Sequence, residues 1–128
     1  MKIPLVDLKA QYRSIKPEID AVVSDVLDSG WYIMGDRVKE FEKRFAEYCT
    51  TTSSIGVGNG TSALRLAVEA CGIGEGDEVI TTPHTFAATS EAIVSCGAKP
   101  VFVDIYEKTY NMDFEKIEEA ITDKTKAI

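Results

Sequence analysis

The sequence lacks a long apolar run and has a single histidine. No apolar stretch approaches the roughly 18 residues of a membrane-spanning helix, so we expect none. The first residues reach an acid at Asp7 without the apolar core of a secretory signal peptide. His84 is the only histidine and no acidic cluster accompanies it, so we expect no metal site.

Cysteine is also scarce, and its spacing argues against a disulfide framework. The three cysteines, Cys49, Cys71 and Cys96, are odd in number and form no Cys-x-x-Cys pair. This pattern favours reduced thiols in the core of a cytoplasmic protein over a redox or zinc-binding role.

Basic residues are too few for a nucleic-acid partner. Fourteen lysines and arginines stand against 21 acids, which gives a net charge of −7 and a pI near 4.7. Contacts to nucleic acids or anionic membranes need a basic face, so we expect neither partner. The 128 residues are 45% hydrophobic and 27% charged, which indicates one globular folding unit and excludes collagen-like or disordered chains.

Hydrophobic periodicity predicts helices and strands along most of the chain. Apolar residues recur at the helical period from Ile15, with Pro17 in the first turn and Gly30 as the C-terminal cap. Asp36 and Asp113 are expected to cap two other helices. The predicted helices are 15–29, 37–49, 63–71, 85–95 and 114–121, and the predicted strands are 54–58, 78–82, 100–104 and one beginning at 125.

The order of these elements predicts an α/β fold. Strands that alternate with helices through short connections form a mostly parallel sheet with helices on both faces. We expect amphipathic helices in residues 1–50 and the start of an α/β domain in residues 51–128. Ligands of such sheets bind at the carboxyl ends of the strands, which directs attention to residues 58–62 and 83–86.

The first of these strand ends has the residues of an anion site. Gly58 and Gly60 allow an anion to approach the backbone, and Thr61 and Ser62 open the next helix. Free N–H groups and the positive end of the helix dipole attract anions there, and the two hydroxyls add donors. The alternative is a plain glycine turn followed by an ordinary helix cap.

The segment Gly58-x-Gly60-x-x-Ala63 also matches the dinucleotide-binding fingerprint. That fingerprint needs an acid near the end of the following strand, where it binds the ribose hydroxyls. Asp77 and Glu78 lie at the start of that strand instead. A dinucleotide-binding domain therefore remains only an alternative.

The second strand end contains His84 and Phe86. An aromatic ring beside a phosphate site can stack on the planar ring of a ligand. Spacing alone, however, favours a core phenylalanine for Phe86 and a hydrogen-bonded loop residue for His84.

Taken together, seven segments resemble the N-terminal part of the DegT/DnrJ/EryC1/StrS sugar aminotransferases. The resemblance covers essentially the whole chain, in order. The segments are Asp7-Leu8-x-x-Gln11-Tyr12, Asp28 to Gly35, Phe41-Glu42 with Phe45-Ala46-x-Tyr48-Cys49, Gly56 to Leu64, Gly76 to Ile80, Pro83 to Thr89, and Val103-Asp104.

The resemblance implies a cytoplasmic, homodimeric enzyme with the aspartate-aminotransferase fold, which is pyridoxal-phosphate (PLP) fold type I. Such an enzyme transfers an amino group, usually from glutamate, to a nucleotide-linked keto-sugar. By the same resemblance, Gly60, Thr61 and Ser62 hold the cofactor phosphate, and Phe86 stacks on the pyridine ring. The Trp31-Tyr32 loop would contact the sugar or the partner subunit, and a buried hydrophobic plug is an equal alternative.

The resemblance also implies what this chain does not contain. Family members are longer, and their catalytic lysine lies beyond the part that matches here. A lysine that forms a Schiff base needs a desolvated pocket or a neighbouring cation, whereas the lysines here, such as Lys39, Lys43 and Lys116, stand in polar contexts. We therefore expect no catalytic residue in this chain, an α/β domain incomplete at its C-terminus, and no activity of the chain alone. A non-catalytic module that binds a phosphate ligand or a partner chain is the second hypothesis.

Overall fold

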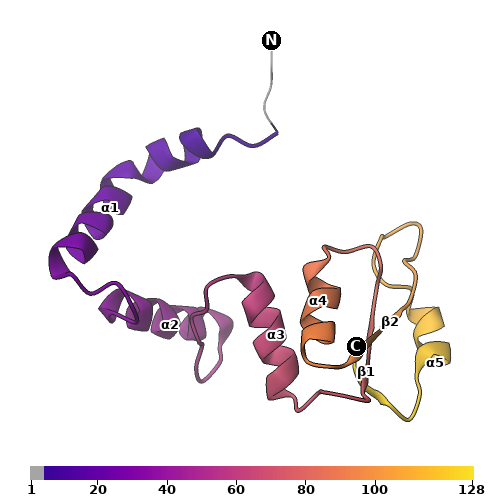
Figure 1. Ribbon diagram of the computed structural model, residues 1–128. Coiled ribbons are helices and arrows are strands. Elements are labelled where there is room, and N and C mark those ends of the chain that lie inside the picture. The colour runs from indigo at the N-terminus through magenta and orange to yellow at the C-terminus, as the bar shows by residue number, and fades with distance from the viewer. Residues whose placement is uncertain (1–4) are drawn as a thin grey trace. The chain divides into compact units, whose positions relative to one another are not determined.

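The computed structural model describes residues 5–128, which form two compact units (Figure 1). The first unit ends at Gly56 and the second runs from Val57 to Ile128. Residues 1–4, part of the segment in which no signal peptide is expected, lie outside the described residues. None of the described helices is both long and apolar enough to cross a membrane.

The first unit begins with helix α1, Leu8–Ser29. Its N-cap is Asp7, whose carboxylate accepts a hydrogen bond from the N–H of Ala10 at 2.9 Å. Gly30 ends the helix in the left-handed conformation with φ 66°, which confirms the predicted cap. The predicted position of Pro17 in the first turn is wrong, because the cap at Asp7 starts the helix further upstream and leaves Pro17 inside it.

Helix α2, Asp36–Cys49, completes the regular structure of this unit. The predicted cap at Asp36 is wrong by one residue: Gly35 is the N-cap and its carbonyl accepts from the N–H groups of Val38 and Lys39. Asp36 is instead the first helical residue, where its carboxylate accepts from Lys39 Nζ at 3.0 Å. An acid in the first turn still favours the helix through its dipole.

Residues 54–58 do not form the predicted strand. Their polar groups bond to α2 instead: Ser54 donates to the carbonyl of Glu42, and the N–H of Gly56 donates to Glu42 Oε1, both at 2.7 Å. A strand exists only through its ladder to a neighbour, and none of the three described strands pairs with this segment.

The second unit contains a parallel three-stranded sheet, as the alternation of elements predicted. Strands β1 (Glu78–Thr81), β2 (Lys99–Phe102) and β3 (Thr125–Ala127) follow the spatial order β2-β1-β3. Strand β1 is central and pairs in parallel with both neighbours. All four of its residues are buried, which is the pattern of a strand covered on both faces.

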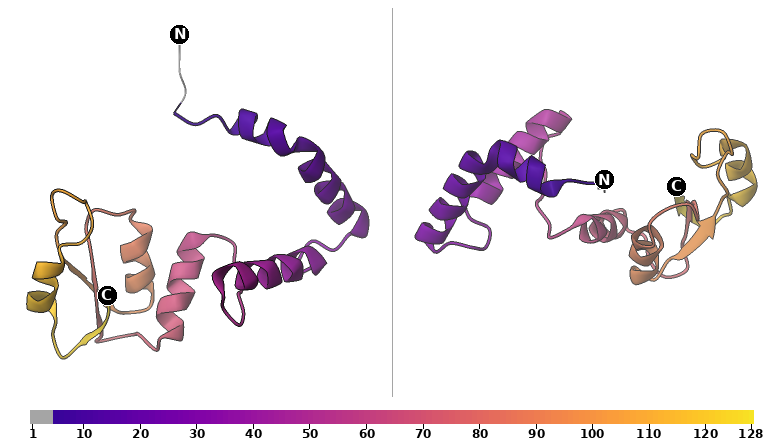
Figure 2. Two further views of the ribbon diagram at one scale, coloured as in Figure 1. Left: turned by 180° about the vertical axis from the view of Figure 1, so that it is seen from behind. Right: turned by 90° about the horizontal axis from the view of Figure 1, so that it is seen from above.

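Four helical segments accompany the sheet: α3 (Gly60–Ala70), α4 (Ala88–Ser95), the 3₁₀ turn η1 (Phe114–Lys116) and α5 (Ile117–Ala120). Helix α3 packs against α4, which packs against β1 and β2. Figures 1 and 2 show α3 and α4 on one side of the strands and α5 on the other. The predicted cap at Asp113 is confirmed, since its carboxylate accepts from the N–H of Glu115 at 3.2 Å.

Two predictions about these helices need correction. Helix α4 starts at Ala88 and not at residue 85, because a loop continues to Phe86, whose carbonyl accepts the N–H of Thr89. Helix α3 was expected to be covered on more than one side, but none of its residues is buried and Leu64 and Leu66 are exposed.

The core of the second unit lies between α4 and the sheet. Ile73, Val79, Ile93 and Ala98 form one buried cluster, with Val68 and Ala127 packed against it. Ile80 on the central strand is the most deeply buried side chain among the described residues, at 1% exposure.

The cysteines are free thiols but were wrongly predicted to be core residues. Cys49 and Cys71 are exposed and Cys96 is half-buried. Cys49 is the last residue of α2, while Cys71 and Cys96 cap the ends of α3 and α4. Each cysteine therefore lies at the C-terminal end of a helix and not on a buried face.

Candidate functional site

The start of α3 offers unpartnered backbone donors. Asn59 is the N-cap, and its side-chain oxygen accepts from the N–H of Ser62 at 2.9 Å, while its carbonyl accepts from Ala63. The N–H groups of Gly60 and Thr61 have no acceptor within residues 5–128. Sequence reasoning missed the part of Asn59, although an asparagine directly before Gly-Thr-Ser is a strong helix-cap signal.

The backbone at Gly58 and Gly60, beside these donors, is uncrowded. An added Cβ at Gly58 or at Gly60 would meet no heavy atom within 4 Å. Thr61 and Ser62 are half-buried, and neither hydroxyl has a hydrogen-bond partner within residues 5–128. No acid occupies the first turn of α3, which leaves the positive end of its dipole uncompensated. The residues present therefore fit a phosphate group.

A ring-bearing loop follows β1 and leads into α4. Phe86 on this loop is 80% exposed, so the alternative of a core phenylalanine is wrong. The loop is held by polar contacts: the N–H of His84 donates to Thr82 Oγ1 at 3.2 Å, and the hydroxyls of Thr85 and Thr89 lie 3.2 Å apart. An exposed ring on a tethered loop is available to a planar ligand.

Residues 58–62, at the start of α3, are called the cradle below. The cradle and the loop of Phe86 lie at the same end of the second unit. Figures 1 and 2 show the first turns of α3 and α4 and the carboxyl end of β1 together at this end. It is the edge of a parallel sheet at which ligands usually bind. The fold thus brings the second-unit candidates Gly60, Thr61, Ser62 and Phe86 to one edge.

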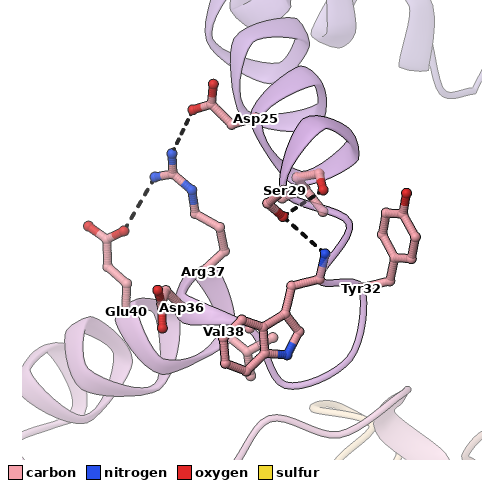
Figure 3. Close-up of a pocket in the computed structure, with 10 residues that line it drawn as sticks. Asp25, Ser29, Tyr32, Asp36, Arg37, Val38 and Glu40 are labelled. Atoms are coloured by element: carbon pink, nitrogen blue, oxygen red, sulfur yellow. Dashed lines mark hydrogen bonds and ion pairs between the residues drawn. The ribbon is translucent and has the colours of Figure 1, made fainter.

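The remaining candidates, Trp31 and Tyr32, belong to the first unit. They line a cavity of about 430 Å³ between the end of α1 and the start of α2 (Figure 3). Trp31 and Tyr32 are 57% and 65% exposed, so the described residues do not bury them as a hydrophobic plug. Trp31 Nε1 donates to the carbonyl of Ile33 at 2.7 Å, and Lys39 Nζ lies 5.4 Å from the centre of the Trp31 ring.

Charged side chains form the other wall of this cavity, as Figure 3 shows. The guanidinium of Arg37 donates to Asp25 at 2.9 Å and lies 3.5 Å from Glu40. Ser29 accepts from the N–H of Trp31 at 3.1 Å. The cavity therefore combines an aromatic wall with hydrogen-bonding groups, a mixture that suits a polar organic ligand.

No lysine within residues 5–128 has the environment of a Schiff-base nucleophile. All of them are exposed. The pKa of Lys116 is raised, chiefly by its hydrogen bond to Asp113, and the pKa of Lys16 is raised by its hydrogen bonds to Asp20 and Tyr12. A raised pKa favours the charged ammonium, which is the unreactive form.

Comparisons with known proteins give one family along nearly the whole chain. The model of the DegT/DnrJ/EryC1/StrS aminotransferase family matches residues 13–128. A "pleiotropic regulatory protein" of Geobacillus stearothermophilus is 49% identical over 128 residues, 100% of this chain and 34% of that protein. UDP-2-acetamido-2-deoxy-3-oxo-D-glucuronate aminotransferase of Pseudomonas aeruginosa is 48% identical over 98% of this chain and 35% of its own length.

Solved structures give the same result for the fold. NtdA from Bacillus subtilis, with bound cofactor PMP, is similar with a TM-score of 0.91 at 33% identity, over 97% of this chain and 29% of that one. The chain thus spans about a third of the length of the relatives that it matches.

Proposed function

Because the chain belongs to the DegT/DnrJ/EryC1/StrS aminotransferase family, we propose that it supplies the cofactor-binding part of a PLP-dependent sugar aminotransferase. The observation that carries the proposal is the start of α3, where the N–H groups of Gly60 and Thr61 have no acceptor within residues 5–128 and an added Cβ at Gly58 or Gly60 would meet no heavy atom within 4 Å. The cofactor-bound structure of NtdA supports it, because PMP is the aminated form of PLP.

We assign cofactor binding to residues 51–128. The N–H groups of Gly60 and Thr61 and the hydroxyls of Thr61 and Ser62 would hold the phosphate, aided by the helix dipole. The ring of Phe86 would lie against the pyridine ring and shield that face from water. PLP, when bound, supplies an aldehyde carbon that takes up and releases an amino group.

Residues 1–50 would serve the substrate or a partner subunit. In this proposal Trp31 and Tyr32 contact a nucleotide-linked keto-sugar or the second protomer of a homodimer, and glutamate is the amino donor. The cavity that they line has an aromatic wall and hydrogen-bonding neighbours, which suit the sugar ring of such a substrate. We place the enzyme in the cytoplasm, which its three free cysteines support.

A second candidate function is a module that binds the phosphate ligand without catalysis. No lysine within residues 5–128 is poised for Schiff-base chemistry, which agrees with both candidates. The name of the Geobacillus relative, a regulatory protein, is consistent with the second. Both candidates share the cradle and differ in whether a covalent link to the cofactor forms.

The dinucleotide alternative is not retained. Asp77 and Glu78 lie at the amino end of β1, as expected, and both are engaged there. Asp77 Oδ2 accepts from the N–H of Gly74 at 3.0 Å, and Glu78 bonds to Lys99 and Thr122. Neither acid reaches the carboxyl edge, where a ribose would lie.

The cradle is tested by replacing Thr61 and Ser62 together with alanine in the full-length polypeptide. This change removes two hydroxyl donors and keeps the backbone N–H groups, so we expect weaker but measurable PLP binding. Hydrogen bonds to a charged group contribute roughly 1.5–3 kcal/mol each, so the loss of two should lower the affinity by at least about a hundredfold. The measurement is a PLP titration followed by absorbance.

Two controls make this test specific. Thr61→Ser keeps the hydroxyl and should bind PLP like the parent. Pyridoxal without its phosphate should bind the parent and the double variant equally. If the double variant binds PLP as tightly as the parent does, the phosphate site lies elsewhere.

A further inference from the structure

Two rings meet across the ends of neighbouring strands. The rings of His84, after β1, and Tyr110, after β2, have centroids 5.8 Å apart and planes tilted by 36°. Strands β1 and β2 pair in parallel, with Thr81 opposite Phe102, so both rings stand at the carboxyl edge that carries Phe86. The function proposed above gives neither ring a part.

Tyr110 is presented by a tight turn. The carbonyl of Tyr106 accepts from the N–H groups of Thr109 and Tyr110, and the N–H of Tyr106 donates to the carbonyl of Asn111 at 2.8 Å. Tyr110 itself has φ 60°, the left-handed region that a bulky side chain rarely adopts. Strained backbone of this kind clusters at functional sites, where the surrounding structure holds it in place.

Among the described residues, few other side-chain contacts hold the loop of Phe86 in place. Phe86 has no aromatic partner within residues 5–128. The hydroxyl of Thr82 bonds within the loop, and that of Thr85 bonds to Thr89 in the first turn of α4. His84 lies two residues before Phe86. Its ring contact with Tyr110 therefore links the loop to the segment that follows β2.

We propose that His84 and Tyr110 are positioning residues that hold the loop so that the Phe86 ring faces the planar ligand. This inference rests on the proposed PLP function and adds two residues to it. Neither ring needs to touch the ligand, because the contact acts through the backbone between His84 and Phe86. A pre-ordered loop has less conformational freedom to lose when the ligand binds, and so binds it more tightly.

The test separates the ring contact from the backbone. In the full-length holoprotein, His84→Ala and Tyr110→Asn remove one ring each, and asparagine tolerates the left-handed backbone. His84→Phe and Tyr110→Phe keep a ring at each position. We expect each ring-deleting variant to release PLP about fivefold faster and to reduce the circular dichroism of the bound cofactor, while both ring-keeping variants match the parent.

Coupling provides the second measurement. The double variant His84→Ala/Tyr110→Asn should be no worse than either single variant, because both lose the same contact. Parent-like PLP release and cofactor circular dichroism in His84→Ala would overturn the inference, and so would additive losses in the double variant. If the parent protein binds no PLP at all, the proposed function itself is wrong. Failure of the inference and failure of the proposed function therefore give different results.

Discussion

Phe86 is the residue whose structural setting most changes its interpretation. Its spacing matched a core position, yet its ring is 80% exposed at the carboxyl edge of the sheet. A large exposed ring contributes little to folding and leaves apolar surface in water. The ring is therefore free to contact a ligand or another segment of protein.

The first prediction follows from that exposure. In the full-length polypeptide, Phe86→Ala should weaken cofactor retention and leave the fold intact, because the ring buries little in the protein itself. A lost ring stack costs on the order of 1 kcal/mol, which is about fivefold in affinity. Retention after dialysis, measured by a cofactor assay, gives the result. Phe86→Tyr keeps the ring and serves as the control, and unchanged retention in Phe86→Ala would exclude stacking.

Strand β1 is the element on which the second unit depends, and Glu78 joins it to both neighbours. The Glu78 carboxylate is buried at the amino end of β1. It accepts from Thr122 Oγ1 at 2.7 Å, just before β3, and from Lys99 Nζ at 2.9 Å, on β2. These hydrogen bonds, that of Thr122 first, lower the pKa of Glu78 below its ordinary value.

The second prediction is the pH dependence of this contact. Because the folded-state pKa is lowered, the ionised carboxylate stabilises the fold above the ordinary pKa of about 4.3. That stabilisation is lost as pH falls through the lower, folded-state pKa. Glu78→Gln should therefore be less stable than the parent at pH 7, and the two should converge in acid.

The measurement is chemical denaturation of parent and variant across this pH range. Glu115→Gln, a change at an exposed acid, provides a matched control and should show no such convergence. A stability difference between parent and Glu78→Gln that stays constant from neutral to acid pH would contradict the assignment.

Taken as a whole, the described residues leave many large apolar side chains exposed. Phe41, Phe45 and Tyr48 on α2 form an aromatic row with ring centroids 5.5 Å and 6.4 Å apart, and all three are exposed. Leu64 and Leu66 on α3 are exposed as well. Such surfaces are normally covered by other protein.

The third prediction is that residues 1–128 alone self-associate or bind a hydrophobic dye. Sedimentation velocity and dye fluorescence are the measurements. Phe41→Glu/Phe45→Glu should reduce both signals, whereas Lys43→Glu on the charged face of α2 should not. A compact, dye-silent monomer at high concentration would contradict the prediction and favour the non-catalytic module.

The fourth prediction concerns the lysines of the chain as a set. All the described lysines are exposed, and the hydrogen bonds of Lys16 and Lys116 raise the pKa of those two side chains, which favours the charged and unreactive ammonium. We expect residues 1–128, incubated with one equivalent of PLP and reduced with borohydride, to carry weak labelling scattered over many lysines. Peptide mass spectrometry maps the label. Near-stoichiometric labelling of one lysine would overturn this and make that residue the lead catalytic candidate.

Local patterns in the sequence determined most of the elements. The helix that ends at Gly30, the cap at Asp113 and the strand predicted at 78–82 and found at 78–81 all follow from the sequence, because periodicity, capping and β-propensity act over a few neighbouring residues. The alternation of strands and helices also determined the parallel sheet. The Gly60-Thr61-Ser62 turn was recognised by sequence for the same reason, since a helix start is a local structure.

Tertiary structure decided what depends on partners distant in the chain. Residues 54–58 have a strand-like sequence but bond to Glu42, since a strand needs a neighbour to pair with. Phe86 and Trp31 are exposed, and Cys49 and Cys71 lie at helix ends, because burial depends on which elements pack together and not on residue type. The contact between His84 and Tyr110 spans two strand ends that only the register of the sheet brings together.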